Sequence, residues 1–290
     1  MRIVKKVRGV LRYILANPSN KGQKCFRLGA AAFWQIYKRT VGLPLIVPLD
    51  NGYQFVADPA SGNSIGVIYT RLYEPEYIMF LREHIVGTDG AMIDAGAHTG
   101  LFTLLLAHLF REGICFEAAR DNFELLDRNF RLNDCTRFRA LRQAVSDHDG
   151  EVDFCVEGSF SGENRVLTSS PDNQGNDAHT TTGRIESVPA TTIDSHVAVH
   201  PLEANLTFLK IDVEGHEMAA LRGARGTLQR APTAMALVEN SDTEAITSFF
   251  RELDWRVFAV SKRGEVSDVD ASCHDLYNLV ACGPEHPLHR

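Results

Sequence analysis

The sequence predicts an α/β protein: a mainly parallel β-sheet with helices on both faces. Two observations lead to this prediction. Short apolar runs that suit buried strands alternate with longer segments that suit helices. The clearest strand, at 92–95, is followed by glycines at positions 96 and 100 and then by an apolar helix. Repeated alternation of strand and helix is typical of a parallel sheet covered on both faces.

The composition is that of an ordinary globular protein. Of the 290 residues, 44% are hydrophobic and 23% are charged, which suits one large domain with or without an appendage. No apolar run reaches the roughly 18 residues of a membrane span, and we identify no secretory leader. The six cysteines are scattered without a C-x-x-C pair. We therefore expect a cytoplasmic location, without a zinc site or a disulfide scaffold.

Charge is divided unevenly along the chain. Residues 1–40 contain ten Lys or Arg residues and no acid, so residues 41–290 hold 20 basic and 37 acidic residues. The basic segment could fold onto its own acidic domain, which we favour slightly, or contact an anionic surface such as a membrane. The acidic remainder argues against a nucleic-acid partner.

The first 70 residues are predicted to form an extension, and residues 71–290 the main domain. Two short helices are expected in 1–40, interrupted at 17–20. Apolar runs between 45 and 57 flank Asp50-Asn51-Gly52, a strong hairpin signal. The helix that opens the main domain begins at Glu74-Pro75-Glu76, because proline and acids suit a first helical turn.

The turn at 94–100 is the first candidate ligand site. Gly96 and Gly100 allow the backbone to approach a ligand, and the next helix directs free N–H groups to the same place. The spacing Asp94-x-Gly96-x-x-x-Gly100 differs from the G-x-G-x-x-G of dinucleotide-binding proteins. Asp94 would repel a pyrophosphate but suits a cationic ligand such as S-adenosylmethionine. A tight turn without a ligand is the alternative.

A second candidate is Glu117, which ends the next apolar strand at 114–117. A carboxylate at that edge of a parallel sheet can accept hydrogen bonds from both hydroxyls of a ribose. A helix cap or a surface acid is the alternative.

The later elements complete the sheet. We expect a third strand at 140–145, a hairpin strand at 152–156 and a polar insertion at 158–187 that forms a lid or is disordered. A fourth strand (206–212), a fifth (235–238) and two closing strands (255–260 and 276–282) follow, and the last of these would pair antiparallel.

Four strings, in this order, resemble a known family. They are Ile93 to Gly100, Phe116-Glu117 before 122–126, Ala144 to Asp147, and Phe208 to Glu217 with its Lys-Ile-Asp-Val-Glu-Gly core. Together they closely resemble the FkbM-type methyltransferases, which use S-adenosylmethionine. The resemblance covers roughly residues 70–240. The chain departs from the family at His98, where Asn is usual, and at Ala118-Ala119, where a proline-containing turn is usual.

The resemblance implies the Rossmann-like class I methyltransferase fold with a seven-stranded sheet. It also implies methyl transfer, most often to a hydroxyl of a sugar, glycan or secondary metabolite. The implied cofactor-binding residues are Asp94, Ala95, Gly96, His98, Gly100, Glu117, Ala118, Ala144 and Asp212. A non-catalytic nucleoside-binding scaffold and a nicotinamide-dependent oxidoreductase are the alternatives, although the spacing at 94–100 argues against the latter.

A hydroxyl acceptor must lose its proton. The candidate catalytic residues are Asp212, Glu214, His216 and Glu239, at the ends of the fourth and fifth strands. His216 suits the role of base because a free imidazole has a pKa of about 6.5, although it could equally be an idle residue of a first helical turn. Asp212, Glu239 and Asn240 could instead hold Mg²⁺. We favour direct hydrogen bonds from Glu239 and Asn240 to the acceptor.

Overall fold

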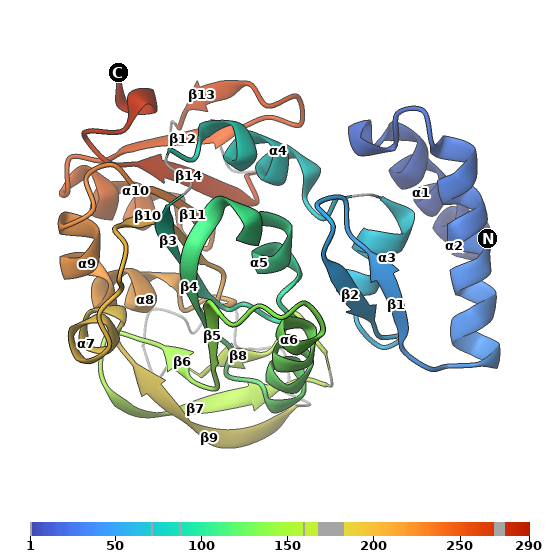
Figure 1. Ribbon diagram of the computed structural model, residues 1–290, viewed down its shortest axis with the longest axis horizontal. Coiled ribbons are helices and arrows are strands. Elements are labelled where there is room, and N and C mark those ends of the chain that lie inside the picture. Colours follow the sequence, from blue (N-terminus) through green and yellow to red (C-terminus); the bar gives the residue numbers. More distant parts are fainter. Residues whose placement is uncertain (1, 71, 87–88, 159, 168–182, 270–275) are drawn as a thin grey trace.

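The computed structural model describes residues 2–70, 72–86, 89–158, 160–167, 183–269 and 276–290. Within these residues, eight strands form a central sheet in the order β13-β12-β14-β11-β10-β3-β4-β5 (Figure 1). They are β3 (Gly90–Ala95), β4 (Phe110–Phe116), β5 (Phe138–Leu141), β10 (Leu206–Ile211), β11 (Met235–Glu239), β12 (Arg256–Val260), β13 (Val266–Asp268) and β14 (Asn278–Cys282).

The central sheet is mainly parallel, as expected. The pairs β4–β5, β3–β4, β3–β10 and β10–β11 are parallel, and β14 lies antiparallel between β11 and β12. The predicted fold class and the antiparallel closing strand are therefore confirmed. The eighth strand was not predicted, because β13 has three exposed residues and no apolar run to mark it.

Helices cover both faces of the sheet, and the two-residue period of the strands decides which side chain meets which layer. On β3, Met92 joins one apolar cluster and Ile93 the other. The first cluster includes residues of α4 (Pro75–His84), α5 (Leu101–Leu106) and α6 (Arg120–Leu132). The second includes residues of α7 (Ile193–Val199), α8 (Glu217–Gly223), α9 (Arg225–Gln229) and α10 (Thr243–Arg251).

The N-terminal extension has the two expected helices, the expected interruption and the expected hairpin. They are α1 (Arg2–Ala16), α2 (Lys24–Thr40), the 3₁₀ turn between them (Pro18–Asn20), and the hairpin of β1 (Leu45–Pro48) and β2 (Gln54–Ala57). A third helix, α3 (Asn63–Tyr69), was not predicted. Ile14 and Trp34 are buried in the same apolar cluster as Phe55 and Leu81, so the extension shares its core with the main domain. None of the described helices combines the length and hydrophobicity needed to cross a membrane.

A second, four-stranded sheet differs from expectation. Its strands are β6 (Ala144–Val145), β7 (Gly150–Val156), β8 (Arg165–Val166) and β9 (Arg184–Thr191), in the order β6-β9-β7-β8. The predicted third strand at 140–145 is therefore two strands, because the chain leaves β5 after Leu141 and pairs again with β9 at Ala144. The predicted polar insertion supplies β8 and the start of β9, while 168–182 lie outside the described residues.

Candidate active site

A cavity of about 320 Å³ lies at the carboxyl ends of β3, β4 and β10, where the small sheet faces the central one. The loops after these three strands supply His98, Glu117, Asp212 and Glu214, and the small sheet adds apolar side chains. Of the residues implied by the family resemblance, Gly96, His98, Glu117, Ala118, Ala144 and Asp212 line the cavity. Asp94, Ala95 and Gly100 are not among its lining residues.

The two glycines of the first turn serve contacts between chain segments. Gly96 has φ +80°, and a Cβ there would overlap the carbonyl oxygen of Asp212. Gly100 has φ +78°, and a Cβ there would overlap the side chain of Leu126 on α6. Gly96 still lines the cavity, but Gly100 contacts the helix instead. The expectation that both glycines admit a ligand is therefore corrected for Gly100.

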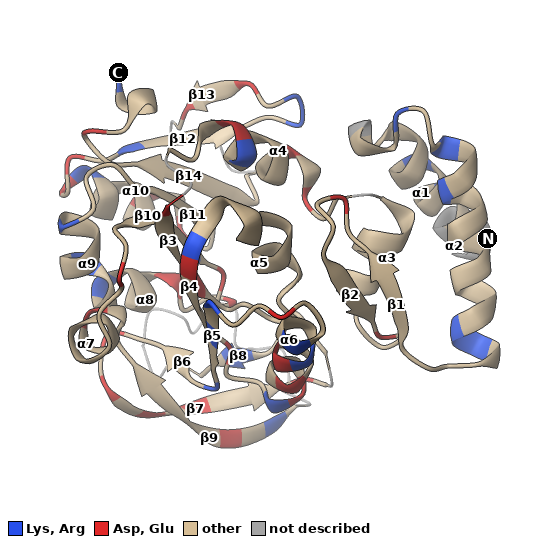
Figure 2. Ribbon diagram, viewed as in Figure 1, with Lys and Arg blue, Asp and Glu red and all other residues tan. Residues whose placement is uncertain are grey.

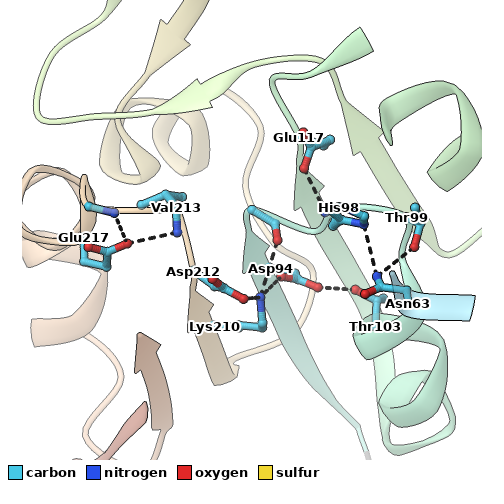
Figure 3. A network of polar contacts seen from close by, with 12 residues as sticks. Asn63, Asp94, His98, Thr99, Thr103, Glu117, Lys210, Asp212, Val213 and Glu217 are labelled. Atoms are coloured by element: carbon cyan, nitrogen blue, oxygen red, sulfur yellow. Dashed lines mark hydrogen bonds and ion pairs between the residues drawn. The ribbon is translucent and has the colours of Figure 1, made fainter. Parts of the chain in front are cut away.

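Glu117 lies at the end of β4 with its carboxylate in the cavity wall. Oε2 accepts a hydrogen bond from the His98 N–H at 2.8 Å (Figure 3). Oε1 accepts one from the Ala119 N–H, also at 2.8 Å. Burial raises the pKa of Glu117 to about 7, although these N–H groups act in the opposite direction. Oε1 also accepts a longer hydrogen bond from the Asn122 amide, at 3.4 Å. Oε2 has one partner among the described residues, so it keeps a second lone pair that can accept a hydrogen bond from a ligand.

Asp94 does not face the cavity, which corrects the expectation that it would meet a cationic ligand. Strand alternation places it on the same face as Met92, towards α5. There its Oδ2 accepts a hydrogen bond from Thr103 Oγ1 at 2.5 Å, and its Oδ1 lies 3.6 Å from Lys210 Nζ. Asp94 is fully buried, so the cation that it meets is Lys210 of its own chain (Figure 3).

Lys210 was given no role by the sequence analysis, yet it lines the cavity. Its Nζ lies 2.8 Å from Asp212 Oδ2 and 3.4 Å from the Gly96 carbonyl oxygen. Burial alone would lower the pKa of Lys210, but Asp212 and Asp94 outweigh burial and raise it. The ammonium therefore stays charged and links β3 to β10. The pairing register of β3 and β10 would have revealed this contact, because Lys210 and Asp94 are direct partners in the sheet.

The loop after β10 is held in an unusual backbone shape. Glu214 has φ +53° and Gly215 has φ +91°. The buried Glu217 supports this shape, because its Oε1 accepts hydrogen bonds from the N–H groups of Val213 and Gly215 at 3.2 and 2.9 Å (Figure 3). Glu217 therefore positions Asp212 and Glu214, a role that the sequence did not predict.

Three carboxylates gather beside this loop. Asp212, Glu214 and Glu239 each offer an oxygen within 4.8 Å of the other two. Burial raises the pKa of Glu239 to about 9, and the neighbouring Asp212 and Glu214 add to this effect. Asp212 is ionised, because Lys210 lowers its pKa against the effect of burial. A protonated Glu239 therefore donates its proton to the hydrogen bond with Asp212.

Glu214 is the third member of this cluster and lines the cavity. Burial raises its pKa to about 7, with further contributions from Asp212 and Glu217. It therefore changes charge near neutral pH, unlike its two neighbours.

Three further predicted residues, Glu239, His216 and Asn240, are not among the residues that line the cavity, although Glu239 lies beside Asp212 and Glu214. His216 Nε2 is 3.0 Å from Ser146 Oγ, and burial lowers the pKa of the imidazole. The geometry gives no support to a role for His216 as the base. Asn240 donates to the carbonyl of Leu276 and accepts from Thr243, so its amide is engaged locally. In the predicted Mg²⁺ site, Glu214 rather than Asn240 lies beside Asp212 and Glu239 and offers the third oxygen ligand.

Several cavity residues were missed because no motif marks them. Tyr73 and Tyr277 line the cavity, and burial raises the pKa of both phenols. Asn63 of α3 donates to Thr99 Oγ1 at 3.0 Å, and its amide nitrogen is 3.1 Å from His98 Nδ1. Burial lowers the pKa of His98 to about 4, so its ring is neutral and accepts this hydrogen bond. The N-terminal extension thus reaches the site.

Three solved structures resemble this fold. The methyltransferase FkbM from Methylobacillus flagellatus KT is 16% identical with a TM-score of 0.44, covering 67% of this chain and 44% of that one. The SAM-dependent methyltransferase from Agrobacterium tumefaciens is 10% identical with a TM-score of 0.46, covering 84% and 71%. SMU.1697c from Streptococcus mutans, a candidate methyltransferase in complex with SAH, is 9% identical with a TM-score of 0.41, covering 71% and 94%.

The chain thus spans less than half of the FkbM structure. No curated protein matches it. The model of the methyltransferase FkbM domain, however, matches residues 94–257, more than half of the chain, and this stretch contains β3, β4, β10 and β11 with their loops. The chain therefore belongs to the FkbM methyltransferase family.

Proposed function

We propose that this protein transfers the methyl group of S-adenosylmethionine to a hydroxyl of a sugar, glycan or other small metabolite. Membership of the family supports methyl transfer. The observation that carries the hydroxyl acceptor is Glu214, a cavity carboxylate whose pKa burial raises to about 7. A base of this strength can take the proton of a hydroxyl at neutral pH.

The cavity fits the cofactor. Glu117 Oε2 keeps a lone pair that can accept from a ribose hydroxyl, and the apolar Phe116, Ala118 and Val145 beside it suit the adenine base. When bound, S-adenosylmethionine supplies an electrophilic methyl group and leaves as a neutral thioether, so no acid catalyst is required. The chain's own contribution is to hold the acceptor in line and to remove its proton.

We assign a different role to each of the three carboxylates of the acidic cluster. Asp212 is a weak base because Lys210 holds its pKa low. Glu239 is protonated at neutral pH, so it can donate a hydrogen bond but not accept a proton. Glu214 is therefore the proposed base, while Asp212 and Glu239 orient the acceptor.

We further propose that the reaction needs no metal. Three carboxylate oxygens within 4.8 Å could hold Mg²⁺. The Lys210 ammonium, 2.8 Å from Asp212 Oδ2, already supplies a positive charge there. We expect full activity in EDTA, and activity that disappears in EDTA and returns with Mg²⁺ would contradict this expectation.

Two experiments test the proposal. Calorimetry with S-adenosylmethionine, S-adenosylhomocysteine and NAD should show binding of the first two, and affinity for NAD alone would favour an oxidoreductase. Incubation with a methyl-labelled donor and an extract of glycans and small metabolites should then label an oxygen of one acceptor class. Cofactor binding without labelling in the host's own extract would favour a non-catalytic scaffold.

A further inference from the structure

Exposed apolar side chains concentrate on the N-terminal extension. Among the described residues, ten of the sixteen large hydrophobic side chains that are exposed lie between positions 7 and 46. Phe26 and Ile36 have 66% and 64% of their surface exposed. Large exposed apolar groups that cluster in this way mark a surface that contacts something else. Figure 1 shows α1 and α2 at one edge of the molecule, with β1, β2 and α3 between them and the central sheet.

The apolar face of α1 is wider than the part that the core covers. Ile14 is buried and Val10 packs against the same cluster. Val7, Leu11 and Leu15 follow one another at intervals of four residues, so they form a neighbouring stripe on the same helix, and all three are exposed. The core therefore uses one half of this face and leaves the other half in solvent.

On α2, the exposed apolar residues lie away from the core. Ala31 and Trp34 are buried. Phe26, Phe33 and Ile36 are spaced by seven and three residues, which places them on one side of the helix, roughly opposite the buried pair. Nothing within the described chain covers this side.

The cations of these helices are not matched by the acids of the main domain. Five cations of this segment are exposed: Arg8, Arg12, Lys21, Lys24 and Arg39. None of the ion pairs among the described residues involves any of these five. Figure 2 shows blue segments on α1 and α2 without red ones. The two helices dock on the chain through apolar contacts and through hydrogen bonds such as those from Arg27 to the carbonyl oxygens of Val67 and Ile68. The positive charge of the five exposed cations remains available.

We propose that α1 and α2 form a peripheral contact with an anionic phospholipid bilayer. The exposed apolar side chains would enter the boundary between headgroups and acyl chains, and Lys and Arg would meet the anionic headgroups. A bilayer satisfies both properties of the surface at once. Two copies paired through the same face would instead bring the exposed cations of one copy towards those of the other, with no acid in residues 1–40 of either copy to balance them.

Sedimentation with vesicles tests this contact. The full chain should bind vesicles of equal parts phosphatidylcholine and phosphatidylglycerol, bind pure phosphatidylcholine about tenfold less, and be released by high salt. Replacing Phe26, Phe33 and Ile36 with Ser, or Arg8, Arg12 and Lys24 with Gln, should each weaken binding about tenfold. Melting temperature and cofactor affinity should not change.

The control is Val199→Ser, which removes an equally exposed apolar side chain at the end of α7 and should bind as the parent does. The proposal would be overturned if the full chain does not bind vesicles, or if it binds charged and uncharged vesicles equally. It would also be overturned if both triple variants bind as the parent does. A concentration-dependent dimer that the Ser variant abolishes would assign the surface to a contact between copies. Because the readout is lipid binding, its failure would leave the proposed methyl transfer untouched.

Discussion

The carbonyl oxygen of Asp212 lies where a Cβ on residue 96 would be, so the turn after β3 and the loop after β10 touch through their backbones. Gly96 also has φ +80°, a conformation that side chains disfavour. The two loops that line the cavity are thus fitted to one another before any ligand binds.

Gly96→Ala should therefore separate these loops. We expect a loss of about 2–3 kcal/mol in the free energy of unfolding, together with loss of cofactor binding. Urea denaturation and calorimetry measure the two effects. Gly29→Ala on α2 is the control, because a Cβ there meets nothing within 4 Å and should not destabilise the protein. Parental stability and affinity in Gly96→Ala would show that the contact is unimportant.

Glu117→Gln tests the ribose assignment. The amide keeps the size of the side chain but loses the charge and one acceptor, while the N–H groups of His98 and Ala119 still need partners. A charged hydrogen bond contributes about 1.5–3 kcal/mol, so affinity for S-adenosylmethionine should fall about 10- to 100-fold. Glu124→Gln, at an exposed position of α6, is the matched control. Calorimetry that gives equal affinities for both variants would reject the assignment.

Glu214→Gln tests the proposed base. Because the pKa of Glu214 is about 7 in the folded protein, kcat/KM of the parent should fall about tenfold per pH unit below 7 and level off above it. The variant should lose about 10²–10⁴-fold in kcat and lack this pH dependence, with little change in affinity for the cofactor. The exposed Glu244 of α10, replaced by Gln, should keep the parental profile. A variant that retains that profile would point to another base.

The sequence predicted the parallel sheet well because its signals are local. The apolar run at 92–95, the break at Pro18 and the Asn-Gly turn at 51–52 each depend on neighbouring residues, and each element formed where expected. The small sheet was missed because β7 pairs with β9 across a long polar segment, and no local pattern marks a distant partner.

The site was predicted only in part, because some of its contacts also depend on distant partners. The positions of Glu117, Asp212 and Glu214 follow from the rule that parallel strands end at one edge of the sheet. The rule does not say which way each side chain points. Asp94 turns towards α5 and meets Lys210, a contact that depends on the pairing of β3 with β10. Tyr73, Tyr277 and Asn63 reach the cavity from segments that carry no motif.

Glu239 should make the stability of the ligand-free protein depend on pH. Its pKa rises from 4.5 to about 9 on folding, so the folded state favours the protonated form. This contribution is complete below pH 4.5, falls as pH rises above 4.5, and is lost once pH passes about 9. Glu239→Gln stays neutral and can still donate to Asp212. The melting temperature of the variant relative to the parent should therefore increase steadily between pH 5 and pH 9.

The control is Glu265→Gln, at an exposed turn, whose difference from the parent should not vary with pH. Thermal unfolding at pH 5, 7 and 9 without cofactor measures both differences. If the melting temperatures of Glu239→Gln and the parent differ by the same amount at pH 5 and at pH 9, Glu239 is already ionised in the folded protein. The hydrogen bond between Glu239 and Asp212 would then lack its proton, and Glu239 rather than Glu214 would have to be tested as the base.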